Sequence, residues 1–125
     1  MIKELINLKK KYNGKRLADT GCSVSKEYQL YQNAFMRAMK ALAANLNAEV
    51  VGSTKGHYYE SVFIERDGKY VYICHEGIDR TKIDFSKDLI CRDAENDKDY
   101  VGGFNRFTTI DQLPKMVDDI FNGTR

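Results

Sequence analysis

Apolar and polar residues alternate most clearly between His57 and His75. Two runs rich in valine, isoleucine, phenylalanine and tyrosine flank the pair Asp67-Gly68 in this segment. Asp-Gly favours a two-residue type I′ turn, because both central residues of that turn need positive φ. The pattern therefore predicts a β-hairpin with strands at about 58–66 and 69–75.

A turn at Asp67-Gly68 also sets the register of the two strands. The expected pairs are Arg66 with Lys69, Glu65 with Tyr70, Ile64 with Val71, Phe63 with Tyr72, Val62 with Ile73 and Glu60 with His75. Side chains alternate along a strand. One face of the hairpin then carries Val62, Ile64, Val71 and Ile73, and the other carries Phe63, Tyr70 and Tyr72.

Three segments have the apolar spacing of amphipathic helices. The first covers about 2–12 and ends at Asn13-Gly14. The second begins at Ser25, runs to about 46 and has apolar residues at 28, 31, 35, 38, 39, 42 and 46. The third covers about 110–121, where Thr109 and Gln112 suit a capping box and Pro114 lies near the start.

Shorter apolar runs predict the remaining strands. We expect one strand at 49–52, followed by a Ser-Thr-Lys-Gly turn, another at 89–91 and a short one around 104–107. Ile83 and Phe85 alternate with polar neighbours, and residues 93–99 form an acidic surface loop. Helices segregated from sequential strands are typical of an α+β fold. We predict an antiparallel sheet of about four to five strands with a central hairpin, two N-terminal helices and one C-terminal helix.

Length and composition indicate one domain spanning residues 1–125, with 42% hydrophobic and 30% charged residues. No run approaches the roughly 20 apolar residues of a membrane span, and the first twelve residues lack the apolar run of a signal peptide. We therefore expect a cytoplasmic protein. The odd count of cysteines (Cys22, Cys74 and Cys91) and their irregular spacing favour reduced thiols over a disulfide framework.

Charge is distributed unevenly although the net charge is only +2. Residues 1–62 hold ten Lys/Arg and five Asp/Glu, a balance of +5, whereas residues 63–125 hold ten and thirteen, a balance of −3. Such a field can steer a charged partner, or the two halves can attract each other. A nucleic-acid-binding accessory protein is one alternative, and its candidate contacts to phosphates are Lys9, Lys10, Lys11, Lys15 and Arg16.

Catalytic and metal-binding chemistry has weak support in the sequence. Cys74 and His75 are adjacent on a predicted strand and point to opposite faces, so they do not readily hold one ion, and we expect no metal and no cofactor. Glu60 lies opposite His75 in the predicted register, which suits an oriented general base. A small hydrolase that adds His57 and a nucleophile at Cys91 or Cys22 is therefore a second alternative.

Tyrosines are concentrated on the hairpin, where Tyr58, Tyr59, Tyr70 and Tyr72 are candidate anchors for a partner protein. A small antiparallel sheet needs helices on only one face. If the helices cover the valine and isoleucine face, the aromatic face stays partly exposed. The alternative is a core on both faces, with helices or loops over each.

The segments YQNAFMRAMKALA (31–43), KGHYYESVFIERDGKYVYICHEG (55–77) and DKDYVGGFNRFTT (97–109) resemble small accessory proteins of phage and conjugative mobile genetic elements of Gram-positive gut bacteria. That resemblance implies no active site and no cofactor, and it implies an inhibitor of host defences of the anti-CRISPR type. At +2, the chain departs from the strongly acidic DNA mimics among such inhibitors. We therefore predict a non-catalytic binding protein that contacts a CRISPR effector or another defence nuclease. The predicted acidic contacts are Asp93, Glu95, Asp97 and Asp99.

Overall fold

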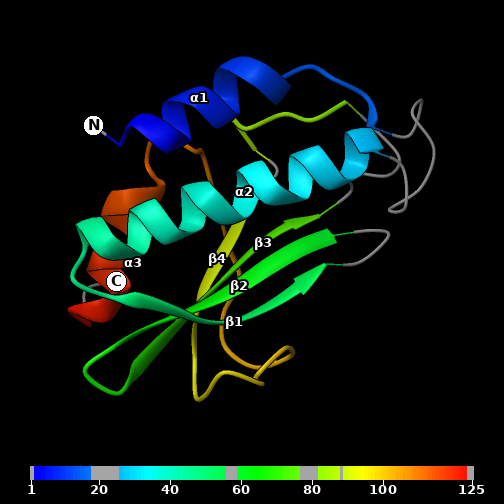
Figure 1. Cartoon of the computed structure of the whole chain (residues 1–125). Coiled ribbons are helices and arrows are strands. Elements are labelled where there is room, and N and C mark those ends of the chain that lie inside the picture. Colours follow the sequence, from blue (N-terminus) through cyan, green and yellow to red (C-terminus); the bar gives the residue numbers. More distant parts are fainter. Residues whose placement is uncertain (1, 18–25, 56–58, 77–81, 88, 124–125) are drawn as a thin grey trace.

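The computed structural model describes residues 2–17, 26–55, 59–76, 82–87 and 89–123, and these residues form an α+β fold (Figure 1). The elements in chain order are α1 (Lys3–Tyr12), α2 (Lys26–Asn45), β1 (Glu49–Lys55), β2 (Tyr59–Arg66), β3 (Lys69–Glu76), β4 (Leu89–Ala94), β5 (Arg106–Thr108) and α3 (Leu113–Phe121). Within the described residues, the strands form one antiparallel sheet in the order β1-β2-β3-β4-β5. The predicted fold class is confirmed.

The central hairpin has the predicted turn and the predicted register. Asp67 and Gly68 both have positive φ, at 53° and 80°. The pairs run from Arg66 with Lys69 to Glu60 with His75 without a shift. This accuracy has a local cause, because a two-residue turn leaves no freedom in how the flanking strands align.

Strand β1 is longer than predicted. Ser53, Thr54 and Lys55 were expected in a turn, but they continue the strand and pair with β2. The pairing shifts by one residue between Val50 and Gly52, which is a β-bulge. The long partner strand β2 supplies hydrogen bonds along its whole edge, and this non-local pairing outweighs the local turn preference of Ser, Thr and Gly.

The helices α1, α2 and α3 of the described residues lie on the same side of the sheet (Figure 1). Helix α2 packs on β1 and β2, α3 packs on β3 and β4, and α1 packs on α2. The resulting core takes the valine and isoleucine face of the hairpin, as predicted. Its buried members include Tyr31, Phe35, Met39, Leu42, Val62, Ile64, Val71, Ile73, Phe85, Leu113 and Val117.

The segment 82–87 contributes to this core without joining the sheet. Ile83 and Phe85 are buried, as their alternation with polar neighbours suggests. Ile83 exchanges backbone hydrogen bonds with the chain after α1, because its carbonyl accepts from Gly14 N (2.7 Å) and its N–H donates to Lys15 O (2.8 Å). The backbone of Phe85 donates to Asn13 Oδ1 at 2.9 Å. The end of α1 is therefore fastened to a distant segment.

Helix α3 begins at Leu113, three residues later than predicted. A helix from residue 110 would need an N–H at Pro114 to reach the carbonyl of Ile110, and proline has none. Residues 109–112 form a turn instead, in which Gln112 N donates to Thr109 Oγ1 at 3.1 Å. The threonine half of the predicted capping box therefore forms, but it stabilises the turn before the helix.

The two residues that flank the hairpin turn hold the C-terminal end of α3. Arg66 donates to Asp118 Oδ1 (3.1 Å) and to Asn122 Oδ1 (3.0 Å), and its guanidinium lies over the Phe121 ring. Lys69 Nζ donates to the carbonyl of Phe121 at 3.1 Å. Cations at a helix C-terminus are stabilising because the helix dipole is negative there.

Candidate protein-binding surface

The sheet face opposite the helices carries a second, smaller core. Phe63, Tyr72, Cys74 and Ile90 are buried there. The chain after β4 covers them, and we call residues 95–105 the cover loop. Tyr100 of the cover loop packs edge-on against Phe63 and Tyr72, with ring centroids 5.1 and 6.0 Å apart. Its hydroxyl lies 3.1 Å from Thr54 Oγ1 on β1, so the cover loop crosses the sheet from β4 to β1.

Arg92 on β4 fastens the cover loop to the sheet. Its side chain is only 2% exposed, and its guanidinium lies over the Tyr72 ring at 4.4 Å from the centroid. It donates to the carbonyl oxygens of Asp99 (2.5 Å) and Asp93 (3.2 Å), and it lies 3.8 Å from the Asp99 carboxylate. A buried guanidinium is tolerated here because carbonyls, a carboxylate and an aromatic ring surround it.

Asp99 organises the cover loop from within. Its carboxylate accepts hydrogen bonds from Gly102 N (2.7 Å) and Glu95 N (3.0 Å). These backbone donors, with a smaller contribution from the Arg92 charge, lower the pKa of the Asp99 carboxyl below its ordinary value. Gly103 has a positive φ of 76°, and a Cβ there would lie 2.5 Å from the carbonyl oxygen of Asp93. Glycine is therefore required at 103 by conformation and by space.

The outer side of the cover loop and of the adjoining strand β5 is strongly apolar. Val101 is 97% exposed, Phe104 69% and Phe107 70%, and the covering residue Tyr100 is 44% exposed. Large apolar residues at this level of exposure, gathered in one short segment, indicate an interaction surface. The sequence prediction missed Val101, Phe104 and Phe107. An available signal was the occurrence of apolar residues beside Gly102-Gly103, directly after an acidic loop.

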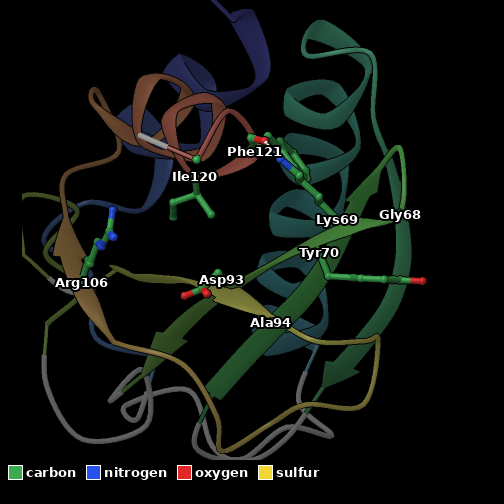
Figure 2. A pocket seen from close by; sticks show the side chains of 9 residues that line it. Gly68, Lys69, Tyr70, Asp93, Ala94, Arg106, Ile120 and Phe121 are labelled. Atoms are coloured by element: carbon green, nitrogen blue, oxygen red, sulfur yellow. Dashed lines mark hydrogen bonds between the residues drawn. The ribbon is translucent and has the colours of Figure 1, made fainter. Parts of the chain in front are cut away.

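The predicted tyrosine anchors do not share one environment. Tyr72 is 8% exposed beneath Tyr100 and Arg92, so its ring offers little surface to a partner. Tyr70 is half-buried, and Figure 2 shows its ring pointing away from the side chains of α3. Tyr58 lies outside the described residues, and Tyr59 is described only as a backbone position at the start of β2. Of the two hypotheses for this face, the structure supports a core on both sides of the sheet.

The four residues predicted as acidic contacts also differ in orientation and exposure. Asp99 directs its carboxylate into the cover loop, and its side chain is 13% exposed. Asp93 lies on β4 opposite Val71 and is half-buried. Glu95 is exposed and Asp97 is half-buried, so these two remain available at the rim of the apolar surface.

The Glu60–His75 pair lies in the helix-side core. His75 is fully buried among Tyr31, Phe35 and Phe85, and its Nδ1 forms a hydrogen bond with the Tyr31 hydroxyl. Glu60 is 1% exposed and accepts a hydrogen bond from Gln32 Nε2 at 2.7 Å. The pair is therefore adjacent as predicted, and both members bind side chains of α2.

The cysteines offered as nucleophiles gain no support. Cys91 on β4 is fully buried, and burial raises the pKa of its thiol to about 12, although the Arg106 charge opposes that shift. A thiol with this pKa holds almost no thiolate near neutral pH. Cys74 is also buried, and Cys22 and His57 lie outside the described residues.

The basic residues near α1 have different surroundings. Lys9 forms an ion pair with Asp111 at 2.8 Å. Lys11 and Lys15 both approach the Tyr12 ring, at 5.6 and 5.7 Å from its centroid. Lys10 and Arg16 are exposed.

Among the described residues, no three His, Cys, Asp or Glu side chains lie close enough together to hold a metal ion. No helix in the described part of the chain is long and apolar enough to cross a membrane. Comparisons with protein-family models, curated proteins and solved structures gave no match to this chain.

Proposed function

We propose that this chain is a non-catalytic binding protein that contacts a partner protein through the cover loop and β5. The observation that carries this proposal is the exposure of Val101, Phe104 and Phe107 on a loop whose base is firmly held by Arg92 and Asp99. An aromatic side chain has only two rotatable side-chain torsions, so it loses little conformational entropy on binding and is an effective anchor.

The exposed apolar area supports an interface of moderate size. Aromatic side chains bury roughly 150–250 Å² each when fully covered, so the four exposed residues offer on the order of 500 Å². This is at the upper end of what a monomer usually exposes in one patch. A standard interface buries about 800 Å² on each partner, so neighbouring polar residues must complete it.

Charge around the apolar residues indicates the chemistry of the partner. Residues 93–99 contain four carboxylates and one lysine, and Glu95 is exposed at the rim. A complementary surface would have an apolar pocket bordered by lysine or arginine. Proteins that bind nucleic acid carry such basic surfaces. In the mobile-element setting implied by the resemblance, we propose a host defence nuclease, such as a CRISPR effector, as the partner.

Binding is favoured over hydrolysis by the surroundings of Glu60 and His75. Both side chains lie beneath α2, where Gln32 donates to Glu60 Oε1 and the Tyr31 hydroxyl bonds to His75 Nδ1. Neither presents a surface to a substrate in this conformation. The nucleic-acid alternative depends on Lys9, Lys10, Lys11, Lys15 and Arg16, and it predicts a salt-sensitive shift of DNA or RNA on a gel.

The test compares three forms of the full chain as baits in a bacterial lysate. They are the wild type, a Val101→Ser/Phe104→Ser/Phe107→Ser variant and a Leu30→Ser control, since Leu30 is 41% exposed on α2. A protein enriched by wild type is then purified and its affinity for each form measured by calorimetry. We expect the triple variant to lose at least a hundredfold in affinity, because removing each of its two aromatic anchors should cost about 2 kcal/mol or more. The control should bind like wild type.

A second measurement addresses the defence nuclease. DNA cleavage by a purified CRISPR effector is followed with increasing wild-type protein and with the triple variant. Inhibition by wild type alone supports the proposed partner. If all three forms recover the same partners equally, the proposed binding surface is wrong. If wild type does not affect cleavage, this nuclease is not the partner, and the binding measurements alone then test the surface.

A further inference from the structure

A second feature, separate from the apolar surface, is a groove between the C-terminal end of α3 and the strands β3, β4 and β5 (Figure 2). It holds a volume of about 290 Å³. Its lining comes from Gly68, Lys69, Tyr70, Asp93, Ala94, Arg106, Ile120, Phe121 and Gly123. Ligand pockets in proteins usually hold about 300–1,000 Å³, so this groove suits a small ligand. We call it the α3 groove.

Arg106 is the most informative residue of the α3 groove. It lies on β5 opposite Cys91, and Figure 2 shows its side chain extending toward that of Ile120 on α3. Within the described residues, its guanidinium forms neither a hydrogen bond nor an ion pair. A half-buried guanidinium has five N–H donors in a fixed fork that matches a carboxylate. The groove therefore offers donors that the fold itself does not use.

Lys69 adds a second cation on the opposite wall. One of its N–H groups donates to the carbonyl of Phe121 at 3.1 Å, which fixes the position of the ammonium. An ammonium has three donors, so two remain for a ligand. The position of Lys69 is determined by the hairpin turn and by α3 together, so the groove is pre-formed on two ordered elements.

Asp93 limits the charge of a suitable ligand. Figure 2 shows its carboxylate on the floor of the groove, on the side toward Arg106. The three charged side chains of the lining then sum to +1, which a single negative charge neutralises. A doubly charged phosphate would meet repulsion from Asp93.

We propose that the α3 groove binds a small organic carboxylate with an apolar body. Arg106 would receive the carboxylate and Lys69 would attract it from the opposite wall, while Ile120 would pack against the body. This inference goes beyond the proposed function, and neither depends on the other.

The test uses ¹⁵N-labelled full chain titrated with benzoate, benzamide and inorganic phosphate, followed by amide chemical shifts. Benzamide has the same ring without the charge, and phosphate has the charge without the ring. We expect saturable shifts with benzoate at Lys69, Asp93, Arg106 and Ile120. Benzamide and phosphate should bind at least tenfold more weakly.

Two variants and one control complete the design. Arg106→Gln should weaken benzoate binding at least tenfold, and Lys69→Gln should weaken it less. Lys115→Gln is the matched control, because Lys115 is an exposed α3 cation paired with Asp119 outside the groove. Since the Arg106 guanidinium forms no hydrogen bond or ion pair with the described residues, the Arg106→Gln variant should stay folded and keep a dispersed spectrum. The proposal would be overturned if benzoate caused no shifts at the groove residues or if Arg106→Gln bound benzoate as wild type does. It would also be overturned if benzamide bound as tightly as benzoate, or phosphate more tightly.

Discussion

Replacing Arg92 by methionine tests how the cover loop is held on the sheet. The substitution keeps most of the volume and lets the side chain pack on Tyr72, but it removes the positive charge and its donors. The carbonyls of Asp99 and Asp93 then lose hydrogen bonds of 2.5 and 3.2 Å, and the Asp99 carboxylate loses its cation. The perturbation therefore acts on polar contacts and largely spares apolar packing.

The expected cost follows from the burial of the guanidinium. Removing one partner of a buried charge pair usually costs about 3–5 kcal/mol, and loss of a desolvated cation–π contact adds up to about 2 kcal/mol. The Asp99 carboxylate keeps its two backbone donors, and the methionine recovers apolar contact with the Tyr72 ring. We therefore expect a loss of about 3 kcal/mol in the free energy of unfolding, or about 10 °C in Tm for a domain of this size.

Urea unfolding followed by far-UV circular dichroism measures this loss, and hydrogen exchange reports on the cover loop. Arg37→Met is the control, because Arg37 is an exposed arginine on α2. Asp99→Asn and the double variant complete a double-mutant cycle, in which we expect the two losses to be less than additive. A loss below about 0.5 kcal/mol for Arg92→Met, with unchanged exchange at 95–103, would refute the account of Arg92 as the fastening of the loop.

Three further predictions concern single positions. Gly103→Ala should lower the free energy of unfolding by clearly more than Gly14→Ala. Both glycines have positive φ, but only a Cβ at position 103 would meet the Asp93 carbonyl oxygen, at 2.5 Å. Thermal melts of the two variants check this, and equal losses would contradict it. The Asp99 carboxyl has a lowered pKa in the folded state. The ionised carboxylate therefore stabilises the fold fully at pH values above its unfolded pKa of about 4, and this contribution is lost as the pH falls through the folded pKa. The free energy of unfolding of wild type should decline more steeply below pH 4 than that of Asp99→Asn, and urea midpoints at several pH values would show the difference. The pKa of the Cys91 thiol is raised to about 12, so Cys91 should react with a disulfide reagent at pH 8 only after unfolding. Peptide mass spectrometry locates the label, and rapid labelling of Cys91 in the native protein would count against its burial.

The hairpin shows how much of the fold follows from local sequence. Asp67-Gly68 and the alternation on either side predicted the turn, the register and the pairing of Glu60 with His75 across the hairpin, all of which the structure confirms. The reason is that a two-residue turn and a period of two residues act within a few positions of each other. The three helices were also predictable in kind and order, since their apolar spacing repeats over several turns.

Boundaries were less predictable where a distant partner decides them. Strand β1 continues through Ser53 and Thr54 because β2 lies beside it, although these residues favour turns. Helix α3 begins only at Leu113, and the carbonyl of Phe85 binds the N–H of Ile110 before the helix starts. In both places the hydrogen-bond partner comes from another part of the chain.

The candidate surface was decided by tertiary structure alone. Sequence placed Tyr70 and Tyr72 on one face of the hairpin but gave no sign that Tyr100 and Arg92 would cover Tyr72. Residues 95–105 have no apolar period, so nothing local indicates which side chains turn inward. Asp99 and Tyr100 are directed inward by contacts with β4, β2 and β1, and Val101, Phe104 and Phe107 are left outside. Periodic segments reveal their faces through repetition, whereas an irregular loop acquires inner and outer sides only from the surface on which it packs.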